Sequence, residues 1–385
     1  MTTPLEHQNQ ESQNTKRRAP LRKRLIYAAA MYFVFLLILA AVEVGARIFL
    51  PHANSLDLFV ATPQQKMQVA NEQQSAIFEG DPLLLWRLKP NLNHVVWDFT
   101  VLSTNAQGIR ANYPTNYKAN GTIRILCLGD SVTFGYRVPV VWPEKPTEYD
   151  PEWLPFPMLL EDALRKANVG RSIEVFPMAV PGYTSHQGLA WLRRDIDDLQ
   201  PDFIIVSFGW NDASLSDVPD VVAIRANWYA VAVRWLIDHS QAFAHATRWL
   251  REKNQTANKI AAGPVPRVGL TNYVNNFLEI VRLAQSHKAA VVVLGAPYRD
   301  RTTNPVEAER MREYRAALRS TMQREQVPYL EILELTEAAA PTNDGFFGEL
   351  IHPNHIGHRL IASDILKLMG KNRMLGDLNI PDLVP

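Results

Sequence analysis

Residues 122–135 read TIRILCLGDSVTFG, an apolar run that ends in Gly-Asp-Ser. The run has the length of a strand, and it is apolar on both faces, as strands inside a parallel sheet are. Gly129 lets the backbone turn sharply, and Ser131 then begins a predicted helix. Ser131 is either a cap for this helix or a nucleophile. A serine nucleophile needs a general base, so the choice depends on residues elsewhere in the chain.

The pattern of an apolar run followed by an amphipathic segment repeats from about residue 121 onward. In one of the segments between the runs, Leu189, Leu192, Ile196 and Leu199 fall on one face at helical spacing. Strands that alternate with such helices predict an α/β fold, a three-layer α/β/α parallel sheet. Its ligand crevice would lie beyond the carboxyl ends of the strands. The further strand candidates are SIEVFPMAV at 172–180, DFIIVSFG at 202–209, AAVVVLGAP at 289–297 and VPYLEIL at 327–333.

Residues suited to acyl chemistry follow four of these strands. Ser131 follows the first strand, Gly182 the second and Asn211 the third, and the last two could donate N–H groups to an oxyanion. His352 follows the fifth strand and could act as general base, with Glu349 three residues earlier to orient its imidazole. Each feature alone also fits a cap or a turn. Together they are predicted to meet at one edge of one sheet.

Three histidines lie close together in GELIHPNHIGH at residues 348–358. We assign His355 and His358 to a helix that follows His352. A zinc site is the alternative, but catalytic zinc needs ligands that converge on one point, and these helix positions diverge. We therefore expect no metal and no cofactor.

The set made of Gly-Asp-Ser131, Gly182, Gly-Trp-Asn211-Asp and His352-Pro resembles the four sequence blocks of the SGNH, or GDSL-like, hydrolase superfamily. The resemblance covers about residues 121–370. It implies a flavodoxin-like α/β/α fold, with Ser131 as nucleophile and His352 as base. It also implies an oxyanion hole formed by the N–H groups of Ser131 and Gly182 and by the Asn211 side chain.

Other parts of the sequence refine this resemblance. PLLLWRLKPN at 82–91 and TNAQGIRA at 104–111 resemble the membrane-anchored bacterial branch of the superfamily. The family usually has aspartate three residues before the histidine, where this chain has Glu349, and Asp344 is a weaker substitute. PMAV also replaces the more usual Asn-Ala-Gly ahead of Gly182.

The N-terminal segment has the composition of a membrane anchor. Residues 1–24 form a polar tail with a basic end, predicted to be disordered and cytoplasmic, and residues 25–50 follow as a predicted transmembrane helix. By the positive-inside rule the basic flank stays in the cytoplasm of the inner membrane and everything after residue 50 crosses to the periplasmic or extracellular side. A cleaved signal peptide and a buried helix are the alternatives, and the long apolar stretch and dense basic flank favour the anchor.

Between the anchor and the C-terminus we expect a decorating subdomain or linker at 51–120 and the hydrolase domain at 121–375. A helical hairpin is predicted within this domain at about 213–268, with Ser240 as a possible cap between its helices. The hairpin could roof the crevice or touch the membrane surface. Its aromatic residues are interpreted as packing residues rather than ligand contacts: Trp228, Tyr229, Trp235 and Trp249.

The formal net charge of +1 gives no indication of a nucleic-acid partner. The single cysteine, Cys127, excludes an intrachain disulfide. From the four motifs and the anchor we predict a membrane-anchored serine esterase outside the cytoplasm, acting on an acylated glycan as an O-acetylesterase. Trp142, Tyr149 or Trp153 in the loop after the nucleophile could stack on sugars or simply pack. The alternatives are a polysaccharide O-acyltransferase, a lipid esterase, or a scaffold with an eroded site.

Overall fold

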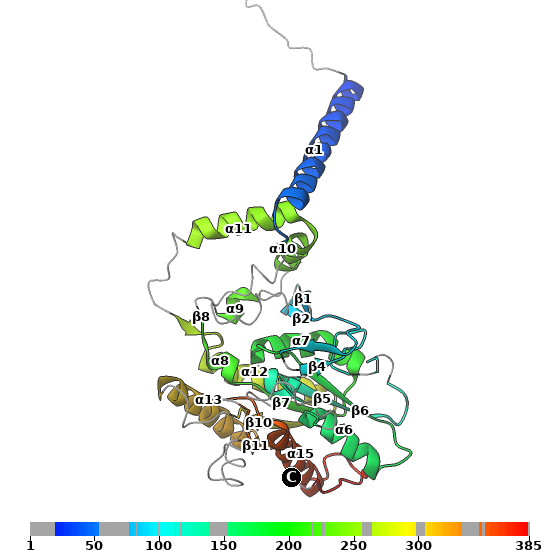
Figure 1. Cartoon of the computed structure of the whole chain (residues 1–385), viewed down its shortest axis with the longest axis vertical. Coiled ribbons are helices and arrows are strands. Elements are labelled where there is room, and N and C mark those ends of the chain that lie inside the picture. Colours follow the sequence, from blue (N-terminus) through cyan, green and yellow to red (C-terminus); the bar gives the residue numbers. More distant parts are fainter. Residues whose placement is uncertain are drawn as a thin grey trace, which may run out of the picture.

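Five parallel strands form the central sheet of the protein, in the order β11-β10-β7-β5-β6 (Figure 1). They correspond to the five strands predicted from the apolar runs, so the predicted parallel sheet is confirmed. The strands are β5 (Ile123–Gly129), β6 (Ile173–Ala179), β7 (Phe203–Ser207), β10 (Ala290–Gly295) and β11 (Tyr329–Glu331). The structure is a computed structural model. It describes residues 20–53, 77–81, 83–98, 100–111, 113–115, 118–138, 153–216, 219–224, 228–255, 264–297, 305–332, 346–348 and 351–383.

Helices cover both faces of this sheet, because the strands are apolar on both sides. In β5, Ile125 and Cys127 belong to one buried cluster, and Leu126 and Leu128 belong to another. The first cluster contains side chains of α6 (Phe156–Ala167) and α15 (His355–Lys371). The second contains side chains of α7 (Ser185–Leu199), α12 (Leu270–Ser286) and α13 (Pro305–Arg324). The fold is therefore the predicted three-layer α/β/α sandwich.

The segment ahead of the sheet forms two antiparallel hairpins. In the first, β1 (Phe78–Asp81) pairs with β2 (Leu85–Leu88), and in the second, β3 (Val95–Trp97) pairs with β4 (Thr100–Leu102). Their side chains, among them Trp86 and Trp97, are buried in the same cluster as Leu126 of β5. The described part of this segment thus shares its hydrophobic core with the α/β domain.

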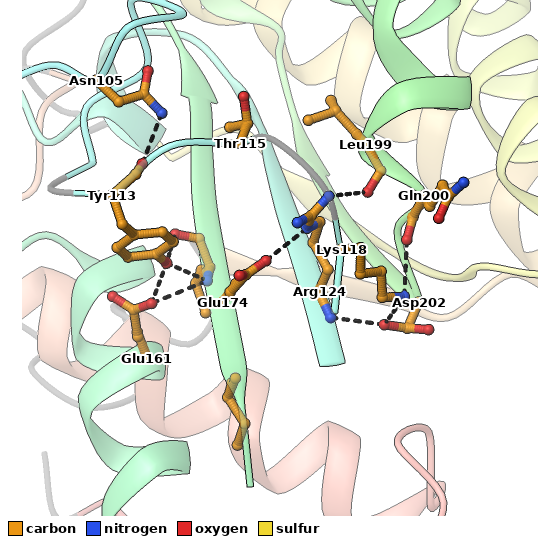
Figure 2. Close-up of polar contacts among 12 residues, drawn as sticks. Asn105, Tyr113, Thr115, Lys118, Arg124, Glu161, Glu174, Leu199, Gln200 and Asp202 are labelled. Atoms are coloured by element: carbon orange, nitrogen blue, oxygen red, sulfur yellow. Dashed lines mark hydrogen bonds and ion pairs between the residues drawn. The ribbon is translucent and has the colours of Figure 1, made fainter. Parts of the chain in front are cut away.

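The residues after these hairpins protect the edge of the sheet. The edge strand β6 points the N–H of Val175 away from β5, and this N–H donates to the Tyr113 hydroxyl at 2.9 Å and to a Glu161 carboxylate oxygen at 3.1 Å (Figure 2). Tyr113 also hydrogen-bonds Glu161 directly. An edge strand whose backbone groups are occupied does not offer them to another chain.

A buried arginine connects the start of strand β5 to its neighbours (Figure 2). The Arg124 side chain is fully buried, and it donates to Glu174 at 2.7 Å and to the Leu199 carbonyl at 2.6 Å. Its backbone N–H donates to Asp202, which also pairs with Lys118. A buried guanidinium needs such partners, because an unpaired charge in a core strongly destabilises it.

The helix α1 (Leu21–Phe49) stands apart from the α/β domain (Figure 1). Its side chains are exposed almost throughout, with Ala46 the one buried residue. Among the described residues it is the one helix long and apolar enough to cross a membrane. It could serve as a membrane span or as a signal anchor.

The chain leaves the sheet after β7 and forms the helical hairpin expected there. Its helices are α10 (Trp228–His239) and α11 (Gln241–Gln255), reached through α8 (Trp210–Ala213), β8 (Leu215–Ser216) and α9 (Asp220–Ala223) and left through β9 (Val265–Pro266). The hydroxyl of Ser240 accepts from the Phe243 N–H at 3.1 Å, so Ser240 caps α11.

Three of the hairpin's aromatic residues, for which a packing role was expected, are exposed rather than buried in a core. Tyr229, Trp235 and Trp249 have exposed fractions of 66%, 52% and 60%. The side chain of Trp228 lies outside the described residues. The physical reason is that the hairpin consists of two helices with few apolar side chains buried between them. Its cluster of buried hydrophobic residues consists of Ala53, Ile237 and Ala244, which is too small to cover these three aromatic side chains.

Candidate active site

Ser131 lies at the carboxyl end of β5, between β7 and the edge strand β6, as the first residue of the short helix α5 (Ser131–Phe134). The cap of this helix is Asp130, whose carboxylate accepts from the Val132 N–H at 3.0 Å. Burial raises the pKa of Asp130 to about 6. Because Asp130 takes the capping role, the Ser131 hydroxyl has a different partner.

Gly129 allows this strand to turn directly into the helix. A Cβ atom at this position would lie 2.0 Å from the Thr133 hydroxyl oxygen and 3.0 Å from the Ser207 carbonyl oxygen. No side chain fits between these groups, so the tight turn that presents Ser131 requires glycine.

The partner of Ser131 is His352. Its Nε2 atom lies 2.7 Å from the Ser131 hydroxyl oxygen, and both residues are buried to more than nine-tenths. A hydroxyl and an imidazole at this distance have the geometry of a nucleophile and its general base.

The local backbone holds His352 in place. The Gly348 N–H donates to the His352 carbonyl at 3.0 Å, and Phe347 forms an isolated bridge with Pro353. Asn354 then caps α15 by accepting from the Gly357 N–H at 3.0 Å. α15, which begins three residues after His352, packs against α6. This packing holds the start of α15, and with it the neighbouring His352, beside α6.

Tyr136 also contacts the imidazole. Its ring lies against that of His352, with centroids 4.6 Å apart. Its hydroxyl hydrogen-bonds the carboxylate of Asp98, which lies between β3 and β4. Arg137 holds the same carboxylate with two hydrogen bonds, of 2.8 and 3.0 Å.

A second buried arginine fixes the end of the nucleophile helix. Arg110 donates to the carbonyl oxygens of Phe134 at 2.5 Å and Gly135 at 3.2 Å, and also to those of Val101 and Val138, both at 3.1 Å. The last carbonyl groups of a helix have no partner within the helix itself. Arg110 therefore connects α5 to β4 and stabilises the turn that carries Tyr136.

The loop after β6 places Gly182 beside this site. In the sheet, Gly129 pairs with Ala179 of β6 and with Ser207 of β7, so Ser131, Gly182 and Asn211 follow one row of residues. Gly182 has a φ of 86°, in the region that favours glycine.

Side chains from three segments hold the loop around Gly182. The Asn211 side chain donates to the Tyr183 carbonyl at 3.0 Å, and the Trp86 indole donates to the Pro181 carbonyl at 3.3 Å. Arg267 donates to the Gly182 carbonyl at 2.8 Å. The loop is thus fixed by β2, by α8 and by the chain that returns from the helical hairpin.

Arg267 forms a buried ion pair with Asp220. The Asp220 carboxylate accepts from Arg267 at 3.0 and 3.1 Å and from the Thr184 hydroxyl at 2.7 Å. Arg267 and Asp220 flank the helical hairpin in the sequence, so this pair closes its base against the loop of Gly182.

Asp212, next to Asn211, adds a further buried bond. Its carboxylate accepts from the Ser185 N–H at 3.0 Å and from the Ser185 hydroxyl at 2.5 Å. Burial raises the pKa of Asp212 to about 8. The bond joins the segment that carries Asn211 to the first turn of α7, just after Gly182.

The model of the GDSL-like lipase/acylhydrolase family matches residues 127–360, more than half of the chain. The chain belongs to this family. The matched residues include Ser131, Gly182, Asn211 and His352.

Individual proteins with similar sequences or structures share 14–31% sequence identity with this chain. An arylesterase from Vibrio mimicus is 31% identical over 99 residues, which are 26% of this chain and 42% of the relative. The match thus spans less than half of that arylesterase. A lipase/acylhydrolase from Enterococcus faecalis has 17% identity and a TM-score of 0.42, and the match covers 68% of this chain and 99% of its own. A catalytic mutant of an acetylxylan esterase from Geobacillus stearothermophilus has 14% identity and a TM-score of 0.43, with coverage of 66% and 97%.

The other two histidines point to different neighbours in this family member. His355 stacks on Trp153 with ring centroids 3.8 Å apart, and the Nδ1 of His358 accepts from the Phe156 N–H at 3.2 Å. Burial lowers the pKa of His358 to about 3. His352, His355 and His358 therefore do not converge on one point. The predicted acid Glu349 and the substitute Asp344 lie outside the described residues, as do Trp142 and Tyr149.

Four supporting residues escaped the sequence analysis: Asp98, Arg110, Tyr136 and Arg267. Arg110 lies in TNAQGIRA and Tyr136 directly follows the nucleophile helix, so proximity to recognised motifs was the available signal for these two. Asp98 and Arg267 carried no such signal, because their partners are distant in the sequence.

Proposed function

We propose that this protein is a serine esterase in which Ser131 is the nucleophile and His352 the general base. The observation that carries the proposal is the 2.7 Å hydrogen bond between the two side chains. In the proposed reaction His352 takes the hydroxyl proton while the Ser131 oxygen attacks the ester carbonyl. The imidazolium then gives the proton to the leaving alcohol, and water activated by the same imidazole releases the acid from the acyl-enzyme.

The oxyanion of the tetrahedral intermediate would be bound by the N–H groups of Ser131 and Gly182 and by the Asn211 amide. An amide nitrogen carries two hydrogens, and the Tyr183 carbonyl engages Asn211 through one hydrogen bond of 3.0 Å. This bond fixes the plane of the amide, and the second hydrogen would serve the oxyanion. Preorganised donors of this kind contribute a large share of catalysis in acyl transfer.

Glu349 is proposed to orient the His352 imidazole. The family usually places an aspartate there, and glutamate carries the same charge on a side chain one methylene longer. A carboxylate in this role holds one tautomer and stabilises the imidazolium that forms during the reaction.

We further propose that α1 anchors the enzyme in the cytoplasmic membrane and that the substrate is an acylated glycan outside the cytoplasm. The apolar stretch from Leu25 to Val42 and its basic flank support the anchor. Trp153 supports the proposal of a glycan substrate, because its indole could stack on a sugar. It lies beside His355, which is three residues from His352.

The catalytic proposal is tested with the full chain in detergent and a panel of soluble aryl esters. Ser131→Ala and His352→Ala should each abolish turnover while the circular dichroism spectrum is kept. Ser172→Ala, an exposed serine, is the matched control and should retain full activity. A serine-directed phosphonate should label the native chain and not Ser131→Ala. Full turnover by Ser131→Ala would refute the assignment.

The substrate proposal has its own test. The same preparation is given acetylated oligosaccharides and long-chain acyl esters, and the released acid is measured. Faster release of acetate from the glycan supports the O-acetylesterase. Faster release of the long-chain acid would instead identify a lipid esterase, and acyl groups recovered on an added sugar acceptor would identify an acyltransferase.

A further inference from the structure

The helix α11 carries an exposed apolar face. Ala246, Trp249, Leu250 and Lys253 are exposed and fall on one side of the helix at the spacing i, i+3, i+4, i+7. Trp249 and Leu250 have exposed fractions of 60% and 52%. The Lys253 ammonium lies over the Trp249 ring, 5.2 Å from its centroid. Large apolar side chains exposed as a group mark an interaction surface.

This face points away from the rest of the protein. The opposite side of α11 carries Ala244, which is buried with Ile237 of α10. At 100° per residue, the four exposed residues centre on the side of the helix opposite Ala244. In Figure 1, α10 lies between α11 and the α/β domain, and α1 extends to the far side of α11. The apolar face of α11 is therefore directed to the side on which α1 runs.

The junction of α1 and α11 is rigidly bonded. The Glu43 carboxylate of α1 accepts from the backbone N–H groups of Gln241 and Ala242, both at 3.0 Å, and from the Ser240 hydroxyl at 2.7 Å. Arg47 donates to the His239 carbonyl at 3.0 Å. A carboxylate at the first turn of a helix also interacts favourably with the helix dipole.

The junction lies at the level where the membrane would end. The uncharged stretch from Leu25 to Val42 is about 27 Å long at 1.5 Å per residue, close to the thickness of a hydrocarbon core. Glu43, which holds α11, is the next residue. Figure 1 shows α11 running across the axis of α1 rather than along it. In a bilayer spanned by α1, α11 would lie parallel to the surface at headgroup depth.

We propose that α11 is an interfacial helix that rests on the same bilayer that α1 crosses, with Trp249 and Leu250 inserted below the headgroups. The proposal rests on the membrane anchor included in the proposed function. A lipid surface fits the composition of this face, since tryptophan, leucine and lysine together are typical of helices at the membrane boundary. With two attachments, the bilayer restrains the tilt of the catalytic domain, because the hairpin base is closed by Arg267 and Asp220 beside the Gly182 loop.

The test uses the full chain in vesicles of phosphatidylcholine and phosphatidylglycerol that contain lipids with a nitroxide, placed at headgroup depth for labels outside α1 and deep in the acyl chain for the label in α1. A fluorophore is attached through Ala246→Cys on α11, and in separate samples through Phe35→Cys in α1 or Val169→Cys on the α/β domain. Val169 is 90% exposed, and the one native cysteine, Cys127, is buried and does not react. The label at 246 should be quenched several-fold more than the label at 169, and the label at 35 should also be quenched.

The outcomes separate the parts of the proposal. Quenching at 35 without quenching at 246 would overturn the interfacial helix and leave the anchor in place, as expected if another protein or a second copy covers this face. A lack of quenching at 35 would overturn the anchor and the interfacial helix together. Turnover of a soluble ester, measured in the same vesicles, reports on the catalytic proposal independently of both.

A charge variant gives a second test of the contact. Trp249→Glu combined with Leu250→Glu should lower quenching at 246 to the level at 169, because carboxylates resist burial among lipids. Turnover of the soluble ester should be unchanged. Val306→Glu, on an exposed apolar residue of α13, is the matched control and should leave the quenching at 246 as it was. Unchanged quenching in the double variant would contradict the proposed depth of α11.

Discussion

The ring of Tyr136 lies against the imidazole of His352, with centroids 4.6 Å apart. Ser131 and Tyr136 belong to one short segment at the end of β5, so the same segment supplies both contacts to the histidine. Asp98 then connects this segment to the hairpin of β3 and β4. The segment ahead of the sheet thereby takes part in the geometry of the proposed catalytic pair.

The first prediction concerns Tyr136. Tyr136→Leu removes the flat surface beside His352 and should lower kcat about 10-fold to 100-fold, because a small misplacement of a catalytic group has effects of this size. Tyr136→Phe keeps the ring and should retain most of the activity. KM for a small aryl ester should change little in either variant. Equal losses of kcat in both variants would show that the hydroxyl bond to Asp98, rather than the ring, is the feature that matters.

The second prediction concerns the buried pair of Arg267 and Asp220. Arg267→Met leaves Asp220 charged and buried, which should lower the free energy of unfolding by about 3–5 kcal/mol. It also frees the Gly182 carbonyl, so kcat should fall more than in Arg267→Lys. Urea unfolding and ester kinetics measure the two effects. Arg193→Met breaks the exposed pair with Glu279 and serves as control, with an expected loss of about 1 kcal/mol or less.

The third prediction concerns the oxyanion. Asn211→Ala should lower kcat about 100-fold to 1000-fold with little change in KM, because the lost donor acts on charge that develops only in the transition state. Asn168→Ala, at the end of α6, is a control that should leave kcat unchanged. An Asn211→Ala enzyme with native kcat and a raised KM would assign Asn211 to substrate binding instead.

The parallel sheet could be predicted from the sequence because each strand is a continuous apolar run and each crossover helix repeats with the helical period. Ser131, Gly182 and Asn211 could be predicted to lie at one edge of the sheet, because they follow paired residues of neighbouring strands. The position of His352 could not be predicted in this way. β11 is an edge strand, separated from β5 by β10 and β7, so the strand order alone does not explain the contact between His352 and Ser131.

The hydrogen bonds of Arg110 and Arg267 that hold the site in place could not be predicted in the same way. Arg110 and Arg267 are single charged residues in segments without periodicity, and a charged residue in a sequence is usually exposed. Their burial depends on carbonyl oxygens that tertiary folding brings together, such as those of Phe134 and Gly182. The pattern of residues along the sequence does not indicate such long-range contacts. The exposure of Trp249 was missed for a related reason, because hydrophobicity alone does not distinguish a core from a membrane surface.

The last prediction concerns pH and His358. Burial lowers the pKa of this histidine in the folded protein from 6.5 to about 3. The unfolded chain therefore binds the proton more readily, and the stability that depends on neutral His358 is present above pH 6.5 and is lost as the pH falls toward 3. Asp212, with its raised pKa of about 8, acts in the opposite direction, because its contribution is present below pH 3.8 and is lost as the pH rises through 8.

The two effects are separated by comparing the native chain with His358→Gln, which keeps an acceptor for the Phe156 N–H but does not titrate. In urea unfolding between pH 7 and pH 4, the native chain should lose more stability than the variant. The gap should widen by up to about 1.4 kcal/mol for each pH unit below 6.5. Parallel pH profiles of the two proteins would mean that His358 is protonated, or exposed to water, in the folded state.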